Sequence, residues 1–248
     1  MPHTGPMPGQ LEDTSTSQHL EPTRPEPGRL LLALVVMAAA MLVTAFVGRQ
    51  VVLASSSVRR SDASVIDATT GYALERPGLV DALLLWAHLT EPWVLFLVLA
   101  LLAGVLHWRG LVRRRALWVV PVGLVGWGLS ITCKYIVGRP RPVPPEAITV
   151  ADGYSYPSGH ATGSTIAMIL LVVLLWPLAR RTWTRTVLVV AAATLVVLTC
   201  LDRVYLGVHY PTDVVAGVLV GSAMTAAALT IGLRPRPGPT APPQSNRA

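Results

Sequence analysis

The chain has 248 residues, of which 52% are hydrophobic and only 13% are charged, about half the charged fraction of an average soluble protein. Its formal net charge is +7, but the basic residues gather in short loops between apolar runs. This pattern is typical of membrane topology and argues against nucleic acid as a partner. The composition therefore predicts an all-α, polytopic membrane protein with a single membrane domain.

The two ends of the chain are predicted to be disordered tails on the cytoplasmic side. Residues 1–28 are rich in Pro, Ser, Thr and Glu, so they bury too little apolar surface to offset the entropy of ordering. They also lack the apolar core of a secretory signal peptide. Residues 234–248 form a second, Pro-rich tail. The membrane domain is expected to occupy residues 29–233.

Six apolar runs are each predicted to cross the bilayer as a helix. A helix needs about 20 apolar residues to span roughly 30 Å of hydrocarbon. The six runs are Leu30–Val47, Glu91–His107, Ala116–Val137, His160–Leu178, Thr186–Leu201 and Val214–Leu233.

A mixed segment, Gly48–Thr90, separates the first two spans. Its first part is polar, and we expect the charged residues there, including Asp62, to be solvated. Farther along, Val65–Leu74 and Leu79–Leu89 carry apolar residues at helical spacing. These two stretches are predicted to be short helices along the membrane interface, serving either as a cap over a site or as ordinary connections.

Two compact basic loops indicate how the chain runs through the membrane. They follow the second and fourth spans and contain Arg109, Arg113, Arg114, Arg115, Arg180, Arg181 and Arg185. Six spans place both loops on the side of the two tails, and the positive-inside rule makes this side cytoplasmic. The loops Tyr135–Gly159 and Asp202–Thr212 are then predicted to face outward.

The outward loops contain the unusual polar residues. Residues 156–160, Tyr-Pro-Ser-Gly-His, form a small-residue turn that leads into the fourth span. The free N–H groups and the dipole at such a helix start favour an anion. Lys134, the single lysine, lies inside the end of an apolar span, where an ionisable group is costly and indicates function.

The Pro-rich loop at residues 138–142 has two interpretations. Its arginines, Arg139 and Arg141, fit a stiff linker whose side chains snorkel toward water. Alternatively, Arg141 joins Lys134 and Arg203 as one of three cations near the outward face. The two cysteines, Cys133 and Cys200, are expected to be small buried residues rather than a disulfide.

Two histidines and a carboxylate accompany these cations. His160 and His209 both follow turns at outward span ends, and Asp213 comes four residues after His209. Either histidine alone fits a structural role, but the three together favour chemistry. Asp213 lies about one helical turn from His209, where it would fix the imidazole tautomer and stabilise its protonated form.

These residue types suit phosphoryl transfer through a covalent intermediate. Lys134, Arg141 and Arg203 would hold phosphate oxygens and offset the charge of the transition state. One histidine would attack phosphorus while the other protonates the leaving oxygen. The remaining carboxylates are scattered across loops, so no metal or other cofactor is expected.

Three segments together resemble the signature of the type 2 phosphatidic acid phosphatase superfamily. They are Lys134–Pro142 (KYIVGRPRP), Pro157–His160 (PSGH) and Arg203–Asp213 (RVYLGVHYPTD), and their order and spacing agree with the family pattern. The six-span layout with the signature on one face is similar to the integral-membrane branch of the family.

The resemblance implies that His209 is the nucleophile, that Asp213 supports it and that His160 is the general acid. The phosphate-binding residues that it implies are Lys134, Arg141, Arg203, Ser158 and Gly159. One position departs from the pattern, because Asp202 stands where the family often has Ser. A carboxylate there would either orient Arg203 or weaken anion binding.

The leading hypothesis is a lipid phosphatase whose partner is a lipid phosphate from the membrane. Polyprenyl diphosphate, phosphatidic acid and phosphatidylglycerol phosphate are the candidate substrates. The alternative is a phosphotransferase that uses a lipid or sugar hydroxyl as acceptor. A non-enzymatic phospholipid-binding protein is a third hypothesis, but binding alone would need only the cations and not the two histidines with Asp213.

Overall fold

The computed structural model describes residues 20–21, 27–53, 56–142, 148–232 and 234–235. Within these ranges the chain forms helices and one pair of two-residue strands. They are β1 (Leu20–Glu21), α1 (Pro27–Leu53), α2 (Ser56–Leu74), α3 (Pro77–Leu89), α4 (Pro92–Trp108), α5 (Arg113–Val137), α6 (Gly159–Leu175), α7 (Thr182–Tyr205), α8 (Pro211–Gly232) and β2 (Arg234–Pro235).

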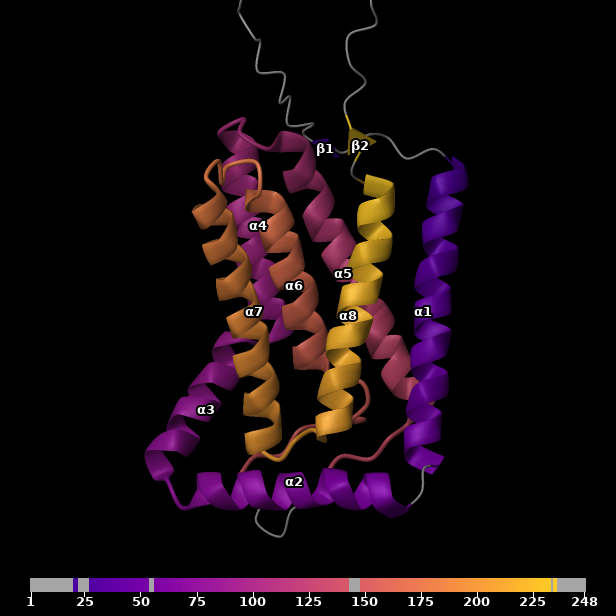
Figure 1. Ribbon diagram of the computed structural model, residues 1–248, viewed down its shortest axis with the longest axis vertical. Coiled ribbons are helices and arrows are strands. Elements are labelled where there is room, and N and C mark those ends of the chain that lie inside the picture. Colours follow the sequence, from indigo (N-terminus) through magenta and orange to yellow (C-terminus); the bar gives the residue numbers. More distant parts are fainter. Residues whose placement is uncertain (1–19, 22–26, 54–55, 143–147, 233, 236–248) are drawn as a thin grey trace, which may run out of the picture.

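Six of the helices, α1 and α4 to α8, stand side by side as an upright bundle (Figure 1). Each corresponds to one of the predicted apolar runs, although the helix ends differ. α1 continues to Leu53, six residues past the predicted Val47, and α7 runs from Thr182 to Tyr205 rather than from Thr186 to Leu201. Polar residues continue a helix where nothing in the sequence breaks it, so apolar content alone underestimates helix length.

Length and composition support fewer membrane spans than the six predicted. Among the described residues, three helices are long and apolar enough to cross a bilayer: Arg113–Val137, Thr182–Tyr205 and Pro211–Thr230. α3 and α4 count as a fourth if taken together, and they are bent by 51° at their junction. α6 has 17 residues, or about 26 Å at 1.5 Å per residue, which is short of the hydrocarbon thickness. The chain is therefore an all-α membrane protein with three to four candidate spans.

α6 lies at the centre of the bundle and contacts α4, α5, α7 and α8. Its first eight residues after His160 are all buried, and small side chains among them allow close packing. A Cβ atom on Gly217 of α8 would come within 2.8 Å of the carbonyl oxygen of Ser158, so α8 needs glycine at this crossing. A core of Phe96, Leu99, Val119 and Leu170 joins α4, α5 and α6 farther along the bundle.

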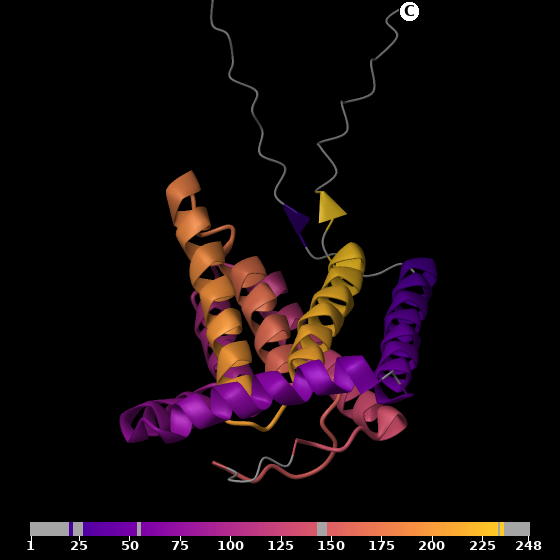
Figure 2. The ribbon, with the colours of Figure 1, turned by 60° about the horizontal axis from the view of Figure 1, so that its bottom comes forward.

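α2 lies across one end of the bundle, nearly at right angles to the upright helices (Figure 1). Turning the molecule shows it running beneath the ends of α7, α8 and α1 (Figure 2). It begins at Ser56, nine residues before the predicted Val65, and α3 agrees closely with the predicted Leu79–Leu89. Their location at the membrane interface stays a prediction.

The described parts of the two predicted tails contact each other. Leu20 pairs with Pro235 and Glu21 with Arg234 in antiparallel register, and α1 begins at Pro27, inside the tail predicted for residues 1–28. The other residues of both predicted tails lie outside the described ranges. Cys133 and Cys200 are both free thiols.

Candidate active site

Four helices bring the predicted site residues to the end of the bundle that α2 crosses (Figure 1). Lys134 lies in the last turn of α5 and Arg203 in the last turn of α7. Gly159 and His160 begin α6, and Asp213 lies in the first turn of α8. Because neighbouring helices are antiparallel, the ends of α5 and α7 meet the starts of α6 and α8.

The local sequence explains where these helices begin and end. Gly138 terminates α5 in the left-handed region, with a φ of 63°, and its N–H donates to the carbonyl of Lys134 at 2.9 Å. Ser158 caps α6, since its Oγ accepts a hydrogen bond from the N–H of Ala161 at 3.4 Å. Pro211 is the first residue of α8, where a missing N–H costs nothing.

His209 and Asp213 form a buried pair. Nδ1 of His209 lies 3.7 Å from Oδ2 of Asp213. The hydroxyl of Ser155 donates to the same Oδ2 at 2.5 Å and lies 3.4 Å from Nδ1 of His209. The backbone N–H of Tyr210 also donates to Oδ2, at 2.9 Å. Ser155 was not among the predicted site residues, and only its nearness in sequence to residues 156–160 hinted at a role.

Arg141 faces the other nitrogen of the His209 ring. Its Nη1 lies 3.0 Å from Nε2 of His209, and its guanidinium also donates to the carbonyls of Asp152 and Gly153. An arginine side chain can only donate hydrogen bonds, so Nε2 is the acceptor. The proton of the neutral imidazole therefore sits on Nδ1, on the side of Asp213, and Nε2 presents an unshared electron pair to the cations.

Burial keeps His209 neutral at physiological pH. It lowers the pKa of His209 from 6.5 to about 4; the hydrogen bond with Asp213 opposes this shift, and the charges of Lys134 and Arg141 add to it. A neutral imidazole is the form that can attack phosphorus.

Among the described residues, no group of three or more His, Cys, Asp or Glu residues is arranged to hold a metal ion.

His160 interacts with a second arginine and with a carboxylate. Its Nε2 lies 3.3 Å from Nη1 of Arg203 and 3.5 Å from Oε1 of Glu91, and the ring also has a backbone hydrogen bond with Ala87. Glu91 immediately precedes α4 and had no predicted role. It supplies the negative charge that a protonated His160 would need as a partner.

Lys134 completes the group of three predicted cations. Its Nζ donates to the carbonyl of Tyr154 at 3.1 Å. It interacts electrostatically with Arg141 and with both histidines, and Arg141 interacts in the same way with Arg203. The structure therefore brings together the three cations, the two histidines and Asp213, while the binding of phosphate by the cations stays a prediction.

Ser158 and Gly159 lie at the start of α6, Ser158 as the capping residue and Gly159 as the first residue of the helix. The Ser158 side chain is fully buried and caps the helix, so its hydroxyl already has a structural partner. A Cβ atom on Gly159 would lie 3.5 Å from Cε of Lys134, which leaves the helix start open toward the cations. The N–H groups of Gly159 and His160 have no carbonyl from an earlier turn to bond, so they remain donors suited to an anion.

Asp202 orients Arg203, the first of the two alternatives for this position. Its Oδ2 accepts from Nε of Arg203 at 2.8 Å and also from Nη2. This two-point pairing fixes the plane of the guanidinium group and turns Nη1 toward His160. Within the described part of the chain, Oδ1 of Asp202 has no hydrogen-bond partner.

Arg139 and Asp62 contradict the sequence prediction, because both are buried. They are 5% and 4% exposed. Arg139 donates from Nη1 to Oδ1 of Asp213 at 2.5 Å and from Nη2 to Oδ2 of Asp62 at 2.7 Å. The snorkelling interpretation is therefore wrong for Arg139, and Asp62 is not solvated. The loop after α5 and the crossing helix α2 meet here, and each charge is buried because the other compensates it.

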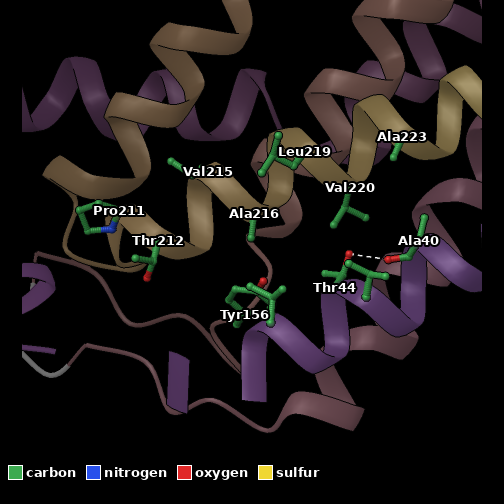
Figure 3. A pocket seen from close by; sticks show the side chains of 12 residues that line it. Ala40, Thr44, Tyr156, Pro211, Thr212, Val215, Ala216, Leu219, Val220 and Ala223 are labelled. Atoms are coloured by element: carbon green, nitrogen blue, oxygen red, sulfur yellow. Dashed lines mark hydrogen bonds between the residues drawn. The ribbon is translucent and has the colours of Figure 1, made fainter. Parts of the chain in front are cut away.

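An apolar groove of about 480 Å³ runs beside the site, between α1 and α8 (Figure 3). Pro211 and Thr212 lie at one end of the groove, Ala40 and Ala223 lie at the other, and Tyr156 lies between them. Thr212 adjoins Asp213 in the sequence, so this end borders the buried pair. From Thr212 to Ala223 the groove follows α8 for about 16 Å, at 1.5 Å per residue.

The model of the PAP2 superfamily matches residues 97–236 of the chain. This range contains every predicted site residue, but it excludes Asp62 and Glu91.

Several curated proteins are similar to the chain. Decaprenylphosphoryl-5-phosphoribose phosphatase of Mycobacterium tuberculosis (strain ATCC 25618 / H37Rv) is 30% identical over 187 residues, covering 70% of this chain and 92% of that protein. The protein of the same name from Mycolicibacterium smegmatis is 34% identical and covers 65% of this chain and 84% of its own length. Phosphatidylglycerophosphatase B of Escherichia coli (strain K12) is 38% identical over 96 residues, covering 38% of this chain and 35% of that protein.

A solved structure shares the fold. It is the transmembrane PAP2-type phosphatidylglycerolphosphate phosphatase from Bacillus subtilis, with a TM-score of 0.64 over 82% of this chain and 93% of that one, at 20% identity.

Proposed function

Because the chain belongs to the PAP2 superfamily and is a membrane lipid phosphate phosphatase of that family, we propose that it hydrolyses a lipid phosphomonoester through a phosphohistidine on His209. The observation that carries this proposal is the orientation of the His209 ring. Nδ1 faces Asp213, and Nε2 faces the cations at a distance of 3.0 Å from Arg141. The ring is thus held with its nucleophilic atom toward the place where a phosphate would bind.

In the first half of the reaction, Nε2 of His209 attacks phosphorus in line with the leaving oxygen. The P–N bond forms as the P–O bond to the lipid breaks. His160 takes up a proton when the anionic phosphate binds and engages Arg203, and it donates this proton to the departing alkoxide. Asp213 stabilises the positive charge that the phosphorylated ring acquires. Lys134, Arg141 and Arg203 offset the charge on the phosphoryl oxygens.

In the second half, water attacks the phosphohistidine. Neutral His160 now accepts a proton from that water, the P–N bond breaks, and inorganic phosphate leaves. His160 is then protonated again for the next cycle. The carboxylate of Glu91 lies 3.5 Å from Nε2 of His160, where it would stabilise the positive charge of the protonated ring.

We propose a polyprenylphosphoryl phosphoribose as the first candidate substrate. Support comes from the mycobacterial relative that matches over 92% of its length, whereas phosphatidylglycerophosphatase B matches over 35%. The groove between α1 and α8 offers an apolar surface for a long hydrocarbon chain beside the site. Phosphatidylglycerol phosphate is the second candidate, and phosphatidic acid and polyprenyl diphosphate follow.

Phosphate release from a panel of these four lipids in detergent would test the substrate. We expect the highest kcat/KM for the polyprenylphosphoryl phosphoribose and no release by His209→Ala, which serves as the inactive control. Adding a polyol acceptor separates hydrolysis from phosphotransfer. Hydrolysis predicts that all phosphate appears as inorganic phosphate, while a phosphorylated polyol as the main product would favour the transferase.

The reaction is proposed to need no metal ion, because Lys134, Arg141 and Arg203 take the position of magnesium in other phosphatases. Activity is expected to survive an excess of chelator. Vanadate, which mimics five-coordinate phosphorus, is expected to inhibit. A magnesium requirement that returns on adding the ion back would contradict the assignment of these three side chains.

We further propose that all six upright helices cross the membrane and that the site opens to the outer face. The six helices are parallel or antiparallel to one another in the bundle, which supports a common crossing direction. The basic loops between α4 and α5 and between α6 and α7 lie at the end opposite the site (Figure 1), in agreement with a cytoplasmic position for those loops.

A further inference from the structure

Arg139, which the sequence analysis did not place in the site, is bonded to two buried carboxylates. Its Nη1 donates to Oδ1 of Asp213 at 2.5 Å and to the hydroxyl of Thr212 at 2.7 Å. Its Nη2 donates to Oδ2 of Asp62 at 2.7 Å. The face of the guanidinium group lies over the Tyr210 ring, 4.2 Å from its centre. One side chain thus joins the loop after α5 to α2 and to the start of α8.

These contacts hold the Asp213 carboxylate from the side opposite His209. Oδ1 of Asp213 bonds Arg139, while Oδ2 accepts from Ser155 and from the N–H of Tyr210 and faces His209. A carboxylate bound at one oxygen alone could rotate about its Cβ–Cγ bond. With both oxygens held, Oδ2 keeps its place beside Nδ1 of the nucleophile.

Asp62 holds Arg139 in turn. Besides its bond with Nη2, it accepts from the hydroxyl of Thr212 at 2.5 Å and from the N–H of Thr212 at 3.3 Å. Asp62, Arg139 and Asp213 are at most 5% exposed, so bulk water does not screen these charges. The site residues of α8 are therefore connected through Arg139 to a helix that lies outside the family signature.

We propose that Arg139 is a positioning residue for the phosphatase reaction: it fixes Asp213 against His209, and Asp62 of α2 fixes Arg139. This inference rests on the proposed roles of His209 and Asp213. It makes α2 part of the catalytic apparatus instead of a simple connection or cover. Arginine is required because its planar fork reaches two carboxylates at once, which the point charge of a lysine does not do.

Arg139→Met is expected to lower kcat by roughly 100-fold, the loss that a displacement of about 1 Å in a reacting group produces. KM should change little, because Lys134, Arg141 and Arg203 still bind the phosphate. Arg139→Lys should keep the positive charge but lose the simultaneous bonds to Asp62 and Asp213, so its kcat should also be reduced. For Asp62→Asn, the second variant of the proposal, Asp67→Asn is the matched control, since it removes the same negative charge from an exposed position on α2.

The pH dependence distinguishes positioning from a general loss of structure. His209 faces the charged or titratable groups Lys134, Arg141, Asp213 and His160. Removing the Arg139 charge frees Asp213 to attract a proton onto His209, so the acidic limb of kcat/KM should move to higher pH. In Asp62→Asn, Asp213 is the only carboxylate left to pair with Arg139, so the acidic limb of kcat/KM for this variant should move to lower pH. Limbs that stay in place in both variants would overturn the proposal.

Thermal stability gives a second way to distinguish a positioning role of Arg139 from a purely structural one. Arg139→Met leaves the buried carboxylates of Asp62 and Asp213 uncompensated and should lower the Tm. Adding Asp62→Asn removes one of the two charges, so the double variant should regain part of the Tm while its kcat remains low. A kcat that recovered together with the Tm would mean that Arg139 is only structural.

Labelling of the wild-type enzyme with a radioactive lipid phosphate keeps this test separate from the proposed function. Wild-type enzyme that forms no phosphohistidine would defeat the roles of His209 and Asp213 themselves. Wild-type enzyme that labels normally beside an equally active Arg139→Met variant would defeat the positioning role alone.

Discussion

The two histidines of the site have different surroundings, and these lead to different losses on substitution. His209 is buried with its Nε2 toward the cations, whereas His160 is near Arg203 and Glu91. His209→Ala should lose turnover by at least about 10⁴-fold, as removal of a covalent nucleophile does. His160→Ala should lose roughly 10²–10⁴-fold, the contribution of general acid catalysis, and most for poor leaving groups.

Rapid-quench labelling measures the same difference directly. The wild-type enzyme should give an acid-labile phosphoenzyme, and His209→Ala should give none. A substrate with a good leaving group should still label His160→Ala, because its departing oxygen needs little protonation. Full activity in His209→Ala would contradict the assignment of His209 as the nucleophile.

The lowered pKa of His209 sets the pH range of both activity and stability. With a pKa of about 4 instead of 6.5, the neutral ring persists well below neutral pH, so the acidic limb of kcat/KM should lie near pH 4. Between pH 6.5 and 4 the unfolded chain binds a proton that the folded chain does not, so the free energy of unfolding should fall as the pH falls through this window. His88→Gln, at an exposed histidine, should change neither profile.

The residues proposed to bind or attack the phosphate could be predicted from the sequence better than the residues that hold them in place. His209, His160 and the cations are recognisable because charged groups are rare at the ends of apolar runs. Ser155 and Asp62 give no such signal, since each is one polar residue in a polar segment. Their importance comes from contacts across 58 and 150 positions of the chain, which only folding brings together.

At the scale of elements, apolar periodicity predicted every upright helix and both short helices before α4. It could not give the buried contact between Asp62 and Arg139, which joins α2 to the loop after α5. It also overestimated how many helices are long enough to span a bilayer alone. α6 is apolar and buried at the centre of the bundle, and this central position explains its small residues and its modest length.

The groove between α1 and α8 gives an element-scale test of the lipid proposal. Ala223 is exposed and lines the groove at the end away from the site, so Ala223→Trp should fill that part of it. We expect a higher KM for long-chain lipid phosphates and an unchanged kcat/KM for a water-soluble aryl phosphate. Ala226→Trp is the control, because Ala226 is exposed on the same helix but does not line the groove. Equal effects of the two tryptophans would argue against the groove as the chain-binding surface.

For the whole molecule, the distribution of arginine predicts which side of the membrane the site faces. The two loops at the end away from the site, with the helix turns that follow them, contain Arg109, Arg113, Arg114, Arg115, Arg180, Arg181 and Arg185 and no acidic residue. The loops at the site end have basic residues too, but Asp152, Asp202 and Asp213 oppose them. From the positive-inside rule we therefore predict that the site faces the outside of the cytoplasmic membrane.

Cysteine accessibility would test this orientation in a background of Cys133→Ala and Cys200→Ala. Val150→Cys, at a position that is 88% exposed in the site-end loop, should react with a membrane-impermeant maleimide in intact cells. Leu111→Cys, in the opposite loop, should react only after lysis. The reverse pattern would place the chemistry on the cytoplasmic face.

The pairing of β1 with β2 restricts the number of times the chain can cross the membrane. Leu20–Glu21 and Arg234–Pro235 are joined as neighbouring strands, so we expect the two segments to lie on one side of the bilayer. A chain that leaves one side and returns to it crosses an even number of times. Three crossings are odd and would separate the strands, so the pairing agrees with an even number, such as the six crossings proposed above.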